Sequence, residues 1–113
     1  MRLEIESLWS PDLDPPGQGV PEDCSDFEVL VQAEIAEVGK PGSEVFSLVV
    51  ASPSALSRTE SGRFVADTLV LNQFDWAAIS SRIHKLLLHC DSCESWEAAV
   101  QTVGGFLRHN ESE

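Results

Sequence analysis

The chain has 113 residues, of which 42% are hydrophobic and 23% charged, and its 19 acidic and 7 basic side chains give a formal net charge of −12. This apolar content argues against a disordered acidic tail, and no apolar run approaches the roughly 20 residues needed to cross a bilayer. The negative charge would repel phosphate backbones, which argues against nucleic-acid binding and favours a basic partner. We therefore expect residues 1–113 to form one acidic domain.

The cysteines and the start of the chain bear on the cellular compartment. Three cysteines cannot all pair within one chain, and they are too few for a secreted disulfide scaffold. Met1 to Glu6 alternates polar and apolar residues, whereas a signal peptide contains an uninterrupted apolar stretch. Both observations favour a cytoplasmic protein.

The first part of the chain has the pattern of β-strands. Leu3 to Trp9 predicts a short strand, and residues 10–25, which contain four prolines and two glycines, predict a long acidic loop. Phe27 to Ile35 places apolar residues at every second position and is the clearest strand. Turn residues at 39–42 then favour an antiparallel hairpin with a strand over Glu44–Val50.

The second part changes from strands to helices. We expect a brief helical turn at Ser54–Arg58 and a further strand at Arg63–Leu71. Trp76 to Cys90 and Trp96 to Leu107 place apolar residues at steps of three and four, the pattern of amphipathic helices. Gly104 and Gly105 would bend the second helix or bring it close to a neighbour. The expected fold class is α+β, an antiparallel β-sheet of about four strands with two C-terminal amphipathic helices packed on one face.

One cysteine pair has a spacing that suggests chemistry. Cys90 and Cys93 are three residues apart, so they could bind a metal or form a redox pair. A structural zinc site needs four ligands, and no second pair at ligand spacing occurs among His84, His89, His109 and Cys24. We therefore expect Cys90 to pack as a small apolar residue, with no metal or cofactor bound. The common nucleophile and metalloprotease motifs are missing, so an enzyme is not expected.

The acidic side chains are concentrated towards the N-terminus. Residues 1–46 carry eleven acidic and two basic side chains, a formal charge of −9, whereas residues 47–113 carry eight and five, a charge of −3. A solvated face that keeps the protein soluble would produce this pattern. A domain that binds a basic protein would produce it as well, because complementary charge accelerates encounter and rejects wrong partners.

From Asp26 onward the residues resemble a known family. Their order and spacing are similar to immunity protein family eight of bacterial polymorphic-toxin systems. The similarity to its central hairpin lies in Phe27–Ile35, Gly39, Gly42, Glu44, Phe46, Val50, Ser52-Pro53 and Leu56. It continues through Phe74-Asp75-Trp76, Ile79, Ile83, Cys90 and Ser95-Trp96-Glu97. The chain departs from the family at its end, where the family tends to close with Trp-Glu and this sequence has Leu107–Glu111.

The resemblance implies an immunity protein, or antitoxin, without catalytic activity. Such proteins stay in the cytoplasm and bind a cognate toxin domain, often a nuclease, delivered by a neighbouring cell in contact-dependent growth inhibition. An acidic inhibitor suits a nuclease, which must be basic to hold its substrate. The candidate toxin contacts are acidic residues of the loop and the hairpin: Asp12, Asp14, Glu22, Asp23, Asp26, Glu37 and Glu44.

Two alternatives remain open at this point. The main one is an acidic scaffold or secretion chaperone that handles another basic client protein. An enzyme that uses Cys90 and Cys93 is the more distant one.

Overall fold

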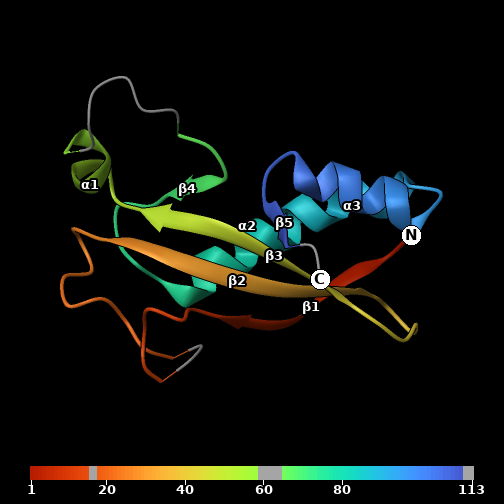
Figure 1. Cartoon of the computed structure of the whole chain (residues 1–113), viewed down its shortest axis with the longest axis horizontal. Helices are drawn as coiled ribbons and strands as arrows, with labels where there is room; N and C mark the ends of the chain where they lie inside the picture. The colour runs from red at the N-terminus through yellow and green to blue at the C-terminus, as the bar shows by residue number, and fades with distance from the viewer. Residues whose placement is uncertain (16–17, 59–64, 111–113) are drawn as a thin grey trace.

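The computed structural model describes residues 1–15, 18–58 and 65–110, which form a five-stranded sheet with helices on one face (Figure 1). The first elements are β1 (Leu3–Trp9), β2 (Glu28–Glu37), β3 (Glu44–Ala51), α1 (Pro53–Ser57) and β4 (Thr68–Val70). They are followed by α2 (Trp76–Leu88), the 3-10 helix η1 (His89–Ser92), α3 (Trp96–Gly104) and β5 (Arg108–Asn110). The predicted α+β class is confirmed.

Strands β1, β2 and β3 form an antiparallel meander. Glu28 pairs with Ala51 at one end of the central hairpin and Ile35 with Glu44 at the other. The turn between these strands contains Gly39 and Gly42 at positive φ (80° and 91°), a conformation that glycine adopts without strain. The hairpin predicted from the alternation of apolar residues is confirmed.

The outer edge of β3 is shared by two short strands. β4 pairs with Val49–Ala51 in a parallel direction, and β5 pairs with Val45–Ser47 in an antiparallel direction. The strand expected over residues 63–71 therefore spans only Thr68–Val70 among the described residues, and residues 63 and 64 lie outside them. β4 departs from the antiparallel expectation because the chain pairs again with β3 at Val49 and then runs towards Ala51, in the same direction as β3.

Helix α3 is shorter than its apolar pattern suggests. It ends at Gly104, so Phe106 and Leu107 lie beyond the helix rather than on its predicted face. A Cβ at Gly104 would meet no atom within 4 Å, so this glycine does not mark a close approach. The chain leaves the helix here because Arg108–Asn110 pairs with β3, a strand that the sequence did not predict.

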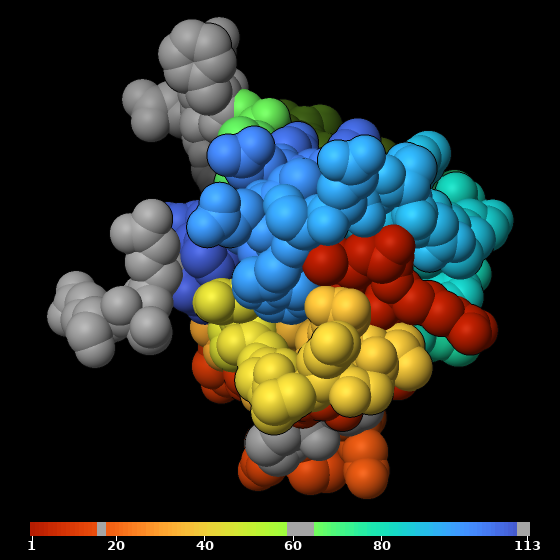
Figure 2. All heavy atoms as spheres, turned by 90° about the vertical axis from the view of Figure 1, so that its right-hand side faces the viewer, coloured from red at the N-terminus to blue at the C-terminus, as the bar shows by residue number. Residues whose placement is uncertain are grey.

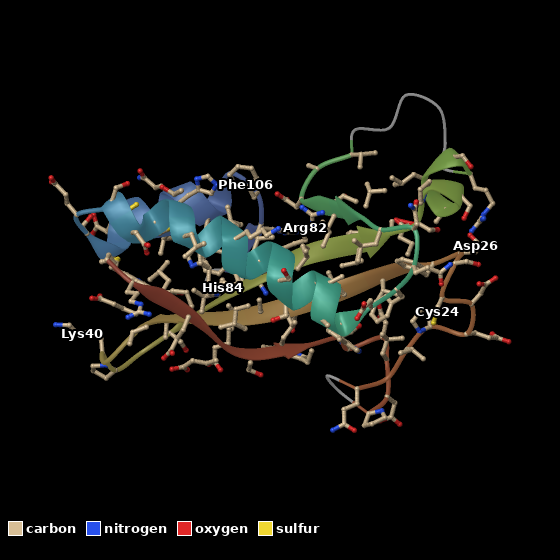
Figure 3. All side chains as sticks on the ribbon, turned by 180° about the vertical axis from the view of Figure 1, so that it is seen from behind. Cys24, Asp26, Lys40, Arg82, His84 and Phe106 are labelled. Atoms are coloured by element: carbon tan, nitrogen blue, oxygen red, sulfur yellow. The ribbon has the colours of Figure 1, made fainter. Side chains whose placement is uncertain are left out.

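Helices α2 and α3 cover the inner face of the sheet and share one hydrophobic core with it. Asp75 caps α2 and Ser95 caps α3, since each side chain accepts a hydrogen bond from a backbone N–H of the first turn. The core contains Val31, Ile35, Phe46 and Leu48 from the sheet and Ile79, Ile83, Leu87, Ala99 and Val103 from the helices. In Figure 3, seen from behind, α2 crosses in front of the strands. Across the described ranges no helix is long and apolar enough to cross a membrane.

Candidate functional site

The acidic loop that follows β1 is held against the rest of the fold. The Ser10 hydroxyl donates to the carbonyl of Leu30, and the Leu30 N–H donates to Asp12 Oδ2 at 3.0 Å. Further along, Trp76 Nε1 donates to the carbonyl of Gly19 at 2.7 Å. Because these bonds reach both β2 and α2, the loop presents its acidic side chains from a fixed position.

Three of the five candidate acids at this end of the sheet have local partners. Asp12 binds the Leu30 N–H, and Asp23 accepts from the N–H and hydroxyl of Ser25 at 2.9 and 2.7 Å. Asp26 accepts from Arg58 at 2.6 Å and from the Ser54 hydroxyl at 2.9 Å. Hydrogen bonds from Ser25 lower the pKa of Asp23, and those from Arg58 and then Ser54 lower the pKa of Asp26. Both carboxylates therefore stay charged at neutral pH.

The side chains of Asp14 and Glu22 are exposed and have no partner within the described part of the chain. Arg58 offsets the charge of Asp26, so Asp14 and Glu22 are the loop acids most available to a second molecule. The sequence showed the charges of the loop, but not which of them the fold already uses.

Glu37 and Glu44 lie at the opposite end of the sheet. They flank the hairpin turn, whereas Asp26 precedes β2, a ten-residue strand about 33 Å long. Figure 3 shows this separation, with Asp26 and the turn residue Lys40 at opposite ends of the molecule. Glu44 Oε2 lies 3.0 Å from His109 Nε2 of β5. The structure therefore brings five of the seven candidate acids together and leaves two apart.

The outer face of the sheet carries acids that the sequence-based site did not include. Alternation along β2 places Glu28 and Glu34 on the face away from the helices, with Leu30 between them. Glu34 accepts a hydrogen bond from the Ser43 hydroxyl at 2.7 Å. The signal for this surface was present in the sequence, because the same period of two that buried Val29 and Val31 turned these residues outward.

A groove of about 380 Å³ lies on the helix side, between α2 and β4. Its apolar floor includes Leu69 and Leu86, and it is also lined by Arg82 and Lys85 of α2 and by His89 of η1. Arg82 and Phe106 lie close together on this side in Figure 3. The groove on the helix side is therefore lined by cations, whereas the acids of β2 lie on the other face of the sheet.

Cys90 is a core residue, as the sequence predicted. It is fully buried in η1, and its Sγ lies 3.9 Å from the carbonyl of Ala99. Burial, with a smaller contribution from neighbouring Cys93, raises the pKa of the Cys90 thiol to about 11, which disfavours the reactive thiolate. Within the ranges that the structure describes, no group of three or more His, Cys, Asp and Glu side chains is placed to hold a metal ion.

Comparison with known families tests the resemblance seen in the sequence. The family model described as immunity protein 8 matches residues 3–110. The chain belongs to the immunity protein 8 family. The match confirms the resemblance and extends it to β1 and the acidic loop, which lie before Asp26. No curated protein and no solved structure matches the chain significantly.

Membership of the immunity protein 8 family implies a toxin as partner. The functional site is then a binding surface, and its character is set by the charge and shape of exposed side chains. The space-filling view in Figure 2 shows one end of the molecule, where α3, β1 and the hairpin turn meet. The acidic loop lies at the other end of the sheet (Figure 1).

Proposed function

We propose that this immunity protein is a cytoplasmic antitoxin that binds and neutralises a cognate basic toxin domain. The toxin belongs to a contact-dependent growth inhibition system or another polymorphic-toxin system, and a nuclease suits the charge of the inhibitor best. The observation that carries the proposal is the family match over residues 3–110. The net charge of −12 supports a basic partner, because a nuclease must carry positive charge to hold its substrate. The protein acts by binding and not by catalysis.

The acidic loop provides the long-range attraction in this proposal. Asp14 and Glu22 are exposed, and Asp12, Asp23 and Asp26 add charge around them. Glu37 and Glu44 contribute from the far end of the hairpin. Charges arranged in this way raise the rate of encounter with a basic protein and orient it before contact.

Co-expression tests the proposal directly. The full chain is produced together with the toxin domain encoded beside its gene, and in parallel with an unrelated toxin. We expect cells to survive the cognate toxin and to die from the unrelated one. Killing by the cognate toxin in cells that contain the folded protein would contradict the antitoxin function.

The same cells address the scaffold and secretion-chaperone alternative, to which the family match gives no support. Affinity purification of the chain from cells that carry the toxin should recover the toxin domain at equal stoichiometry. Recovery of a different basic client in its place would favour the alternative.

A further inference from the structure

We infer that the toxin docks on the outer face of the sheet, with an apolar centre around Leu30 and Val49 surrounded by carboxylates. This inference rests on the proposed function and commits to one occupant, the basic toxin domain. The outer face is defined here by the outward-facing residues of β1 to β5. It is the face turned towards the viewer in Figure 1, with α2 behind it.

The outer face carries exposed apolar side chains. An antiparallel sheet with one covered face normally turns polar residues to solvent on the other face. Here the register places Leu30 of β2 directly opposite Val49 of β3, and Thr68 of β4 on the other side of Val49. Val70, two residues further along β4, pairs with Ala51. Leu30 and Val70 are 36% and 48% exposed. An exposed apolar cluster that crosses three strands is characteristic of an interaction site.

The cluster continues to the first strand. Trp9 pairs with Gln32 on the outer face, while its neighbour Leu8 packs towards the core. Tryptophan is enriched at the centres of protein interfaces because it buries a large area and retains one hydrogen-bond donor.

The outer face is also hollowed. A depression of about 400 Å³ is lined by Leu30 and Val49, with Asp67 and Arg108 at β4 and β5. Asp67 lies in the turn before β4 at a φ of 51°. An apolar wall next to a carboxylate suits a lysine or arginine side chain, whose aliphatic stem packs while its charged end stays polar.

Charge around the apolar centre favours a basic partner. Glu28, Glu34, Asp67 and Asp12 surround it, against the single cation Arg108 among the residues described on this face. In the groove on the helix side, Arg82 and Lys85 would repel the same partner. The contrast orients a basic toxin towards the outer face, next to the acidic loop.

The outer face has the size of an interface. Four strands across and eight residues along give a surface about 19 Å by 26 Å, on the order of 500 Å² before side-chain relief is counted. A standard interface buries about 800 Å² per partner, which the face and the adjoining loop together can supply.

Matched substitutions in the full chain test the inference. Leu30→Arg and Val70→Arg place a cation in the apolar centre. Leu88→Arg is the control, because Leu88 is also an exposed leucine (53%) and the change in charge is the same, but it lies at the end of α2. Binding is measured against a catalytically inactivated form of the toxin domain encoded beside the gene, after circular dichroism has established that each variant is folded.

We expect Leu30→Arg to raise the Kd at least tenfold, mainly through faster dissociation, and Val70→Arg to weaken binding in the same direction. Leu88→Arg should stay within about twofold of the wild type. If Leu30→Arg does not fold, Val70→Arg decides alone. Wild-type affinity in the folded outer-face variants, or equal loss in Leu88→Arg, would overturn the docking site and leave the antitoxin function standing. A wild-type chain that does not bind the toxin would contradict both the docking site and the antitoxin function.

Discussion

At the scale of single residues, Gly19 shows why the acidic loop needs a glycine. A Cβ at this position would lie 2.7 Å from the backbone nitrogen of Asp14, and the carbonyl of Gly19 accepts the hydrogen bond from Trp76. Gly104 offers a contrast, because a Cβ there would meet open space. A side chain is therefore excluded by the backbone at Gly19 but not at Gly104.

Gly19→Ala should lower the free energy of unfolding by about 1–3 kcal/mol, because backbone atoms cannot yield as a side chain can. Gly104→Ala is the matched control, and we expect it to be neutral or to stabilise the protein by up to about 1 kcal/mol at the end of α3. Urea denaturation of both variants measures the difference. Equal stability of the two variants would show that the loop relaxes around residue 19.

The three cysteines should differ in reactivity because they differ in burial. The raised pKa of Cys90 keeps its thiol protonated at pH 8, and its burial blocks reagents, whereas Cys24 and Cys93 are partly exposed. We expect an aromatic disulfide reagent to modify two thiols readily and the third only in denaturant. Rapid modification of all three thiols in the folded protein would contradict the buried position of Cys90.

At the scale of elements, the sequence predicted those strands and helices whose pattern is local. The period of two in Phe27–Ile35 identified β2, and the steps of three and four identified α2 and α3. β5 had no such signal, because Arg108–Asn110 is a short polar run that becomes a strand only by pairing with Val45–Ser47. The direction of β4 also depends on tertiary contacts with β3 that a single sequence does not reveal.

The candidate site, like the strands, could be predicted from the sequence only where it did not depend on tertiary contacts. The positions of acidic residues could be read from the chain, but the use of Asp12 and Asp26 in hydrogen bonds could not. The alternation along β2 predicted the outward-facing acids, but the apolar centre of the outer face became visible only through the register that pairs Leu30 with Val49 and brings Val70 to the next strand.

The pairing of β5 with β3 can be tested at His109, whose side chain contacts two residues of β3. His109 contacts Glu44 and stacks near Phe46, with ring centroids 5.1 Å apart. His109→Ala should cost roughly 1–2 kcal/mol of stability and speed hydrogen exchange at the amides of Val45–Ser47. Arg108→Ala is the control within the same strand, because Arg108 is exposed. Equal exchange in the two variants would show that β5 is held by its backbone alone.

At the scale of the whole molecule, the unequal distribution of charge should govern how fast the toxin arrives. We expect a double variant, Asp14→Lys with Glu22→Lys, to slow association with the inactivated toxin domain several-fold at low salt, since long-range attraction is lost. The difference should shrink at high salt because the charges are then screened. Neither carboxylate has a partner among the described residues, so the fold should survive.

Glu94→Lys with Glu97→Lys provides the same change in charge near the start of α3. Stopped-flow measurements at two ionic strengths compare the two double variants. Equal slowing of both would mean that net charge, and not the acidic loop, sets the rate of association.

The shared edge of β3 also has a kinetic consequence. β1, β2 and β3 join through neighbouring stretches of chain, whereas Val45 must meet Asn110, 65 residues later. Closing that long segment costs more chain entropy, so the hairpin should form early and β5 should dock last. Substitutions in β5 would then accelerate unfolding with little effect on the rate of folding. The lifetime of the folded protein would thus depend on Arg108–Asn110, the three residues of β5.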